Sequence, residues 1–382
     1  MQWRRPPAVL LVLVLVAVAL VGCSTSTPSE ADVRPSSTRP SASAEAEPPE
    51  AGAPDVVLVW VPGGLPDGLV ERLQGLPGVG SASVVLGDTI PLAGVVRGFT
   101  VPVEAIAVDC ASWSTFEPVH GDAVCGLDDG EALLGATSAR LRGAAVGDVL
   151  ELGSGRRLTV AGVVPDEAVG AAELVVPAAG AAAAGVSVPR YVLLEHDGER
   201  SSVEAAIRAA APGTLLRVRA PDEVDWFRHA DAVLPQSAIK ATFGEFGSRP
   251  ASAGRLELDP AWRDTHLVTV ELPVVGQVTC HRDVVSALRG ALDEIADAGL
   301  VDRVDRSASG CWNPRPIAGT DQPSRHAWGV ALDIVPAPDD PRVVEVFARW
   351  GFTWGGDWLT PDPIHFEYVQ PPPRSPSGPA AR

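Results

Sequence analysis

The segment SRHAWGVALD, residues 324–333, decides how the C-terminal part of the chain is organised, and it precedes a second histidine, His365. Its form is S-x-H-x-x-G-x-A-x-D. Gly329 allows a sharp turn after His326, and the residues that follow have the composition of a strand, so the carboxylate of Asp333 can turn back toward the imidazole. Nitrogen and oxygen ligands suit zinc, and two histidines, one aspartate and an open fourth position are typical of a catalytic zinc site.

Further residues extend this pattern along the chain. Arg315 stands before it, a Trp-Gly-Gly-Asp-Trp loop spans residues 354–358, and Asp362 stands three residues before the His-Phe-Glu tripeptide at 365–367. Together these residues resemble the zinc peptidases that include the D-alanyl-D-alanine carboxypeptidases of vancomycin resistance and the L-alanyl-D-glutamate endopeptidases of phages. The resemblance covers residues 233–371 and implies an α+β domain with a small antiparallel sheet.

The resemblance assigns the central chemistry to four of these side chains. His326, Asp333 and His365 are expected to bind Zn²⁺, which would acidify a bound water and polarise the scissile carbonyl. Asp362 occupies the position of the general base, which takes the proton from that water and passes it to the leaving amine. Asp357 is the rival candidate for the base.

The resemblance also indicates which residues contact the substrate and which bond is cut. Arg315 is expected to orient the substrate or stabilise developing negative charge, Ser324 to fix the turn or contact the substrate, and Trp328 to help wall the cleft. The resembled carboxypeptidases commonly carry Glu at the base position, whereas the endopeptidase branch carries Asp, so Asp362 favours L-alanyl-D-glutamate cleavage of peptidoglycan peptides. A D-alanyl-D-alanine carboxypeptidase and a non-catalytic wall-binding module remain as alternatives.

The N-terminus predicts export and a lipid anchor. Arg4 and Arg5 precede an apolar run over residues 8–22, which is short for a membrane-spanning helix. The tetrad Leu-Val-Gly-Cys that ends at Cys23 resembles a bacterial lipoprotein signal, which implies cleavage of residues 1–22 and lipidation of Cys23. An ordinary secretory signal or a tilted anchor is the alternative. The expected location is the outer face of the cytoplasmic membrane, in the cell wall space.

Composition sets limits on the rest of the chain. Residues 23–54 are rich in Ser, Pro, Ala, Thr and Glu and predict a disordered tether, and residues 372–382 predict a disordered tail. The net charge is −18, and an acidic chain repels nucleic acid, so we expect no nucleic-acid partner. The single lysine is Lys240.

Four cysteines remain after Cys23, and an even number in an exported chain indicates disulfides. Three pairings are possible. Pairing within each domain favours Cys110 with Cys125 and Cys280 with Cys311, and the second bridge would hold the loop of Arg315 near the cleft. A cysteine-rich zinc site is disfavoured because the sequence has no C-x-x-C spacing.

Residues 55–225 predict a second α+β domain made of two β-α-β units. The first unit comprises residues 56–61, 66–76 and 81–86, and the second comprises residues 191–195, 203–211 and 214–218. Two such units around an insertion suggest a split ferredoxin-like sandwich. The insertion is expected to hold a helix at 131–141 and strands at 146–152 and 157–164. This region resembles the extracytoplasmic core domain of MacB-type transporter permeases, which has no catalytic residues, and a protein partner is its expected ligand.

The C-terminal domain is expected to contain three further elements. Residues 267–278 predict a strand, and a helix should begin near Asp283 and end before Gly299. A second helix is expected over residues 341–350. His281 lies outside the metal pattern and is expected to be structural.

Overall fold

The computed structural model describes residues 55–94, 96–221, 234–304, 310–334 and 340–369. The predicted signal segment, Cys23, the tether and the tail lie outside the described residues, as do the proposed domain boundaries at 225 and 233. Within the described ranges, no helix has the length and apolar character needed to cross a membrane. We refer below to residues 55–221 as the N-terminal region and to residues 234–369 as the C-terminal region.

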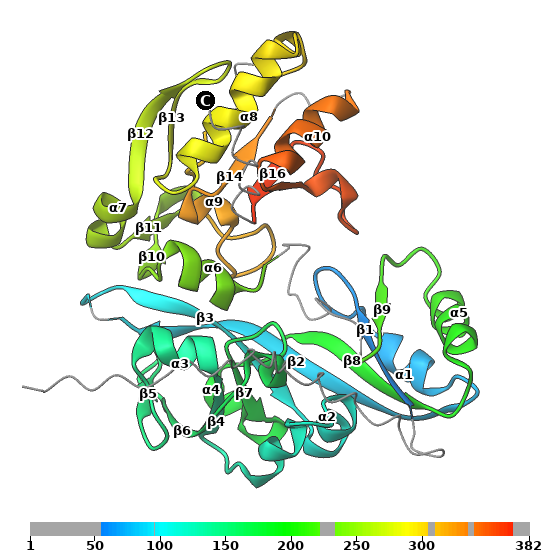
Figure 1. The fold of residues 1–382 in the computed structure, drawn as a ribbon. Helices are drawn as coiled ribbons and strands as arrows, with labels where there is room; N and C mark the ends of the chain where they lie inside the picture. The colour runs from blue at the N-terminus through cyan, green and yellow to red at the C-terminus, as the bar shows by residue number, and fades with distance from the viewer. Residues whose placement is uncertain (1–54, 95, 222–233, 305–309, 335–339, 370–382) are drawn as a thin grey trace, which may run out of the picture. The chain divides into compact units, whose positions relative to one another are not determined.

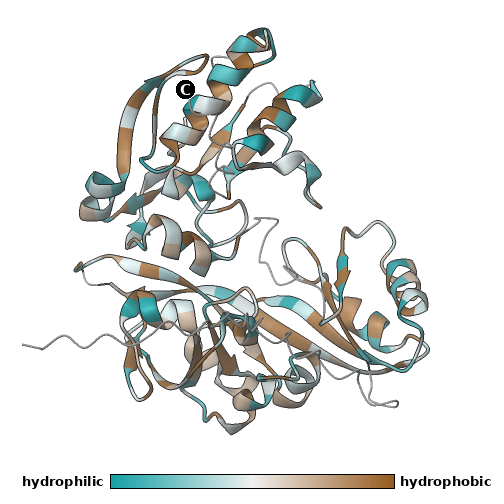
Figure 2. Cartoon of the chain, viewed as in Figure 1, coloured by the Kyte–Doolittle hydropathy of each residue, from teal (hydrophilic) through white to brown (hydrophobic). Residues whose placement is uncertain are grey.

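The fold is α+β, as the sequence predicted, with one large sheet and two small antiparallel sheets (Figure 1). The strands of the large sheet carry mostly hydrophobic residues (Figure 2). Their order across the sheet is β5 (Val149–Glu151), β6 (Arg157–Val164), β4 (Glu131–Gly135), β7 (Leu174–Pro177), β3 (Thr100–Val108), β2 (Val79–Ala93), β8 (Pro189–His196), β1 (Asp55–Trp60) and β9 (Arg217–Arg219). Strand β10 (Ser248–Pro250) also pairs with β3 and with β11 (Leu256–Leu258).

The two predicted β-α-β units interleave at one end of this sheet. The first is β1, α1 (Leu69–Gln74) and β2, and the second is β8, α5 (Arg200–Ala210) and β9. The order β2-β8-β1-β9 is that of a ferredoxin-like sheet, in which each unit contributes one inner and one outer strand. Alternate residues of β1 enter different cores, and Val57 and Val59 pack with Leu69 and Leu73 of α1. Burial on both faces explains the continuous apolar sequence of β1.

Two predicted elements were wrong in type or extent. Residues 131–141 are a strand, β4, followed by the helix α3 (Ala136–Arg142), because residues 131–135 pair with β6 on one side and β7 on the other. Residues 267–278 are the first part of a hairpin of β12 (Leu267–Leu272) and β13 (Gly276–His281) rather than one strand. Val274 and Gly276, with φ of 65° and 77°, form its turn, and a valine in this conformation gives no turn signal in the sequence.

Of the remaining helices, the two that the sequence predicted, near residues 283–299 and over residues 341–350, were predicted closely. The helices of the C-terminal region are α6 (Gln236–Phe243), α7 (Pro260–His266), α8 (Val285–Asp297), α9 (Arg325–Trp328) and α10 (Pro341–Arg349), and α2 (Cys110–Phe116) and α4 (Ala181–Ala184) belong to the N-terminal region. Asp340 caps α10 by accepting a hydrogen bond from Arg342 N. Helices α8 and α10 pack on the sheet formed by β14 (Ala331–Asp333), β16 (His365–Tyr368) and β15 (Phe352–Trp354), which shares their hydrophobic core.

A buried polar network joins the two regions. Lys240 Nζ on α6 lies 2.7 Å from Glu173 Oε1 and 3.2 Å from Glu245 Oε2. Arg142 Nη2, at the end of α3, lies 2.8 Å from Glu173 Oε2 and 2.6 Å from Glu245 Oε2. The only lysine of the chain is therefore used to hold the C-terminal region on the N-terminal one.

A second carboxylate of β3, Glu104, lies at the same interface. Its side chain accepts a hydrogen bond from Gln322 Nε2 of the C-terminal region. Burial is the main reason why the pKa of Glu104 is raised from 4.5 to about 7, and the positive charge of Arg325 opposes this rise. Burial would also raise the pKa of Glu173, but Lys240 and Arg142 lower it to about 2.

Glu104→Gln is expected to change how stability depends on pH. The pKa of Glu104 is higher in the folded chain than in the unfolded chain. Its contribution to the free energy of unfolding is therefore fully present below pH 4.5, and about 3 kcal/mol is lost as the pH rises toward 7. The variant should therefore gain stability over the wild type across this window in urea denaturation followed by circular dichroism. Parallel stability curves from pH 4 to 8 would show that Glu104 keeps an ordinary pKa.

Candidate metal centre

The register of two strands places two of the predicted metal ligands opposite each other. Asp333, the last residue of β14, is the direct cross-strand partner of His365, the first residue of β16. Directly opposed residues of an antiparallel pair point to the same face of the sheet, so the carboxylate and the imidazole meet. Strand pairing thus brings together two residues that are 32 positions apart in the sequence.

The third ligand comes from the short helix α9. Ser324 caps it, because its Oγ accepts a hydrogen bond from His326 N at 3.4 Å. Gly329 ends it with φ of 70°, and a Cβ at Gly329 would lie 2.9 Å from His281 N. Since the next turn passes this close to β13, only glycine fits there. The sequence correctly predicted a turn at Gly329.

Three ligand atoms converge on one point. Asp333 Oδ1 lies 3.0 Å from His326 Nε2 and 3.1 Å from His365 Nδ1, and these two nitrogens are 3.2 Å apart. All three residues are buried. Ligands bound tetrahedrally to zinc at about 2.0–2.1 Å are separated by about 3.3 Å, so this triangle fits a zinc ion with little adjustment.

The outer nitrogen of each imidazole also lies near an oxygen atom. His326 Nδ1 donates to the carbonyl oxygen of Cys311 at 3.1 Å, and His365 Nε2 lies 3.4 Å from Glu367 Oε2. Such outer contacts orient the ring and leave the inner nitrogen free to bind metal. The sequence did not identify either acceptor. Alternation along a strand could have indicated Glu367, two residues after His365, whereas a backbone carbonyl leaves no signal in the sequence.

The charges of the group also suit a cation. Burial would raise the pKa of Asp333, but its hydrogen bonds with His326 and His365 hold the pKa of this carboxyl well below its usual range. Burial would lower the pKa of His365, but contacts with Asp333 and Glu367 raise it to about 9. Without a metal, the acidic groups therefore favour a proton on His365, and a bound cation would take its place.

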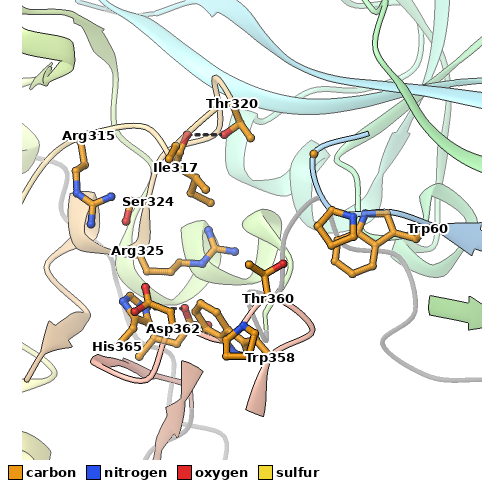
Figure 3. A pocket seen from close by; sticks show the side chains of 15 residues that line it. Trp60, Arg315, Ile317, Thr320, Ser324, Arg325, Trp358, Thr360, Asp362 and His365 are labelled. Atoms are coloured by element: carbon orange, nitrogen blue, oxygen red, sulfur yellow. Dashed lines mark hydrogen bonds and ion pairs between the residues drawn. The ribbon is translucent and has the colours of Figure 1, made fainter. Parts of the chain in front are cut away.

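A pocket of about 420 Å³ opens beside this group (Figure 3). Arg315, Ser324, Asp362 and His365 line it, and Figure 3 shows Asp362 next to His365 with Arg315 on the same side of the pocket. Asp362 N donates to Gly355 O at 2.9 Å, which fixes the loop that carries the carboxylate. Asp357, the rival base, is exposed and does not line the pocket.

One expected substrate contact must be corrected. Trp328 is fully buried, its Nε1 donates to Gly244 O at 3.0 Å, and its ring lies 4.5 Å from that of Phe246. It belongs to the core because α9 turns this face toward α6 and away from the pocket. Trp358 lines the pocket instead, with its ring 5.1 Å from that of His365.

The cysteines and His281 lie as the sequence indicated. Disulfides join Cys110 to Cys125 and Cys280 to Cys311. The second bridge holds the chain segment that includes the Cys311 carbonyl. His281 is buried against Phe243, with Nε2 3.2 Å from the Phe243 carbonyl oxygen, and it is not among the three converging ligands.

Comparison with known proteins shows what part of the C-terminal region is similar to. Residues 318–368 match a family model described as D-alanyl-D-alanine carboxypeptidase, which confirms the resemblance predicted for the segment containing the three ligands and Asp362. This segment is therefore similar to that of a peptidase family. No curated protein matches the chain.

Solved structures of low sequence identity are also similar to the chain. The periplasmic region of MacB from Actinobacillus actinomycetemcomitans is 11% identical, with a TM-score of 0.31 over 44% of this chain and 89% of that one. The extracellular domain of the transporter YknZ from Gram-positive bacteria is 13% identical, with a TM-score of 0.29 over 41% and 91%. A domain of a putative permease from Porphyromonas gingivalis is 17% identical, with a TM-score of 0.28 over 46% and 91%.

The geometry predicts about one zinc per chain, bound by His326, Asp333 and His365. His326→Ala and His365→Ala should each reduce zinc content to near zero after dialysis, measured by atomic emission spectrometry. His120→Ala, a change outside the group of converging ligands, is the matched control and should keep full occupancy. Full zinc content in both ligand variants would show that the metal binds at another place in the chain.

The Cys280–Cys311 bridge is predicted to support metal binding, because it holds the carbonyl that orients His326. A double Cys280→Ser, Cys311→Ser variant should lose zinc affinity by about tenfold or more, the usual scale for contacts behind a ligand. Replacing Cys110 and Cys125 with Ser is the matched control, since that bridge lies in the N-terminal region. Equal zinc affinities of the two double variants, measured by competition with a chromogenic chelator, would exclude this role.

Proposed function

We propose that the protein is a zinc metallopeptidase that hydrolyses peptidoglycan stem peptides outside the cytoplasmic membrane, to which a lipid on Cys23 tethers it. The observation that carries this proposal is the convergence of His326, Asp333 and His365 at the edge of a pocket that Asp362 also lines. A structural metal site would have four protein ligands and no pocket. The family match over residues 318–368 supports a peptidase.

The residues around the pocket divide the catalytic work. Zinc, when bound, supplies a Lewis acid that acidifies water and polarises a carbonyl. Asp362 accepts the proton of the attacking water and delivers it to the leaving amine, so it acts first as base and then as acid. Arg315 provides a permanent positive charge on the same side of the pocket, where it stabilises the negative charge that develops on the carbonyl oxygen. Ser324 holds the turn that carries His326.

Cleavage between L-alanine and D-glutamate is the favoured reaction. The reason is Asp362, which is shorter than the glutamate common at this position in the resembled carboxypeptidases, and a change in reach of about 1 Å alters rates by roughly a hundredfold. Removal of the terminal D-alanine is the second candidate. It is supported by the family description of D-alanyl-D-alanine carboxypeptidase.

The N-terminal region has no converging set of candidate metal ligands among its described residues, so we propose that it positions the peptidase or binds a protein partner. A lipid at Cys23 and a tether over residues 23–54 would let the catalytic part work away from the membrane surface. In this arrangement the substrate is the peptide of the cell wall.

The test is mass spectrometry of purified peptidoglycan fragments before and after incubation with the zinc-loaded protein lacking residues 1–23. Fragments that begin with D-glutamate and carry a new free amino group are expected, and a chelator should prevent their formation. Asp362→Asn should keep zinc and lose hydrolysis by at least about a hundredfold. Asp357→Asn, a matched change on the neighbouring loop, should stay active.

Other products would change the assignment. Free D-alanine from a pentapeptide, without new amino groups on D-glutamate, would establish the carboxypeptidase reaction instead. Loss of activity in Asp357→Asn with an active Asp362→Asn would identify Asp357 as the base. No product from any stem peptide, at full zinc occupancy, would leave the protein as a binding module.

A further inference from the structure

Both regions of the chain build the pocket beside the metal ligands. Trp60, the last residue of β1, lines one side of it together with Pro62 and Gly63 in the connection between β1 and α1. Figure 3 shows Trp60 across the pocket from Arg315, with Thr360 and Trp358 between them. The N-terminal region therefore supplies a wall of the cavity in which the proposed peptide would lie.

Two kinds of contact fix this wall. Leu359, in the loop that carries Trp358 and Asp362, packs against the hydrophobic cluster that contains Trp60. The buried pair between Lys240 and Glu173 and the half-buried pair between Arg142 and Glu245 hold the two regions together farther along the interface. Breaking a buried ion pair costs about 3–5 kcal/mol, so the wall is held in place when the pocket is empty.

Three side chains that line the pocket carry buried donors without acceptors. Arg325 is 3% exposed, and its Nη2 donates to Leu234 O at 2.6 Å, but its Nε and Nη1 have no hydrogen-bond partner among the described residues. The indole Nε1 atoms of Trp60 and Trp358 also lack one there. A buried donor without an acceptor costs about 1–3 kcal/mol, and more when it is charged. Three such side chains around one cavity indicate a ligand that accepts hydrogen bonds.

The charge around Arg325 indicates an anion. Glu104 lies close enough for its charge to interact with that of Arg325. The Glu104 side chain, however, accepts a hydrogen bond from Gln322 and none from Arg325, so Nε and Nη1 of Arg325 have no hydrogen-bond partner among the described residues. A guanidinium N–H donates a short, charge-assisted hydrogen bond to a carboxylate, and Nε and Nη1 of Arg325 are two donors of this kind.

We propose that this pocket is a carboxylate-binding subsite built by both regions, in which Arg325 binds a free carboxylate of the peptide substrate and Trp60 forms the opposite wall. The inference rests on the proposed function, because it takes the ligand to be a stem peptide. Arg325 has a different role from Arg315, which lies on the side of Asp362. The carboxylate belongs either to D-glutamate or to the C-terminus of the peptide.

Peptide binding measured by calorimetry tests this subsite. The full mature chain with Asp362→Asn, loaded with zinc, binds without hydrolysis. It is titrated with the tetrapeptide L-Ala-D-Glu-L-Lys-D-Ala, joined through the D-glutamate side chain, and with two forms that carry an amide in place of the D-glutamate carboxylate or of the C-terminal carboxylate. One amide should weaken binding by about tenfold or more, the scale of a hydrogen bond to a charged group, and its position identifies the carboxylate.

Variants then assign the effect to residues. Adding Arg325→Gln should weaken binding of the acid form and abolish the difference between acid and amide. Arg263→Gln, which removes an exposed arginine paired with Asp264 outside this pocket, is the matched control and should preserve the difference. Trp60→Phe keeps an aromatic wall and removes the indole N–H, and it should weaken the acid form a few-fold. Zinc content is measured in each variant to separate this effect from damage to the metal site.

The outcomes separate the subsite from the proposed function. Equal binding of the acid form and both amides by the parent protein overturns the subsite, even if Arg325→Gln fails to fold. An unchanged preference in Arg325→Gln also overturns it and leaves Arg325 as the counter-charge of Glu104. A preference for the acid in a protein whose wild type cuts no stem peptide supports the subsite and refutes the peptidase.

Discussion

The candidate site depends on one constraint, the antiparallel register that pairs Asp333 with His365. Strand β16 lies between β14 and β15, so its register is fixed on both edges. Along β16, His365 and Glu367 face the site, while Phe366 and Tyr368 enter the hydrophobic core, where the Phe366 ring lies 4.5 Å from that of Phe347. A slip of one residue would bury the imidazole in the core and expose Phe366. The packing that stabilises the sheet therefore also sets the positions of the candidate metal ligands.

Backbone contacts hold the other catalytic groups against this sheet. The loop of Asp362 approaches Gly355 so closely that a Cβ there would lie 2.6 Å from Asp362 O. The segment after Cys311 is held by Trp312 N donating to Thr279 O, and Asn313 N donates to His326 O. Each loop is thus tied to a strand or to α9 within a few residues of its functional group. Functional loops on a rigid scaffold keep their geometry without a ligand to order them.

The structure brings together the three residues that the sequence proposed as ligands, whereas the sequence missed much of what surrounds them, for physical reasons. His326 and Asp333 could be found because a short turn that ends at Gly329 relates them locally, and His365 through its match to a family pattern. Trp328 was misassigned because a four-residue helix shows no periodicity that separates its buried face from its exposed face. Strand β4 was taken for part of a helix, since β6 and β7 decide its pairing and lie distant in sequence. Trp60 could not be connected with the pocket at all, because its proximity is a property of the interface alone.

That interface gives the N-terminal region a physical role that does not require chemistry of its own. Three carboxylates and three cations meet there, Glu104, Glu173 and Glu245 with Arg142, Lys240 and Arg325. A buried polar network is costly compared with an apolar contact, but it tolerates little displacement, since moving one charge leaves another unpaired. An apolar interface would allow the two regions to slide, and the wall at Trp60 would then move relative to Asp362. We infer that charge at this interface fixes the width of the cavity, which a site for peptides of defined length and stereochemistry requires.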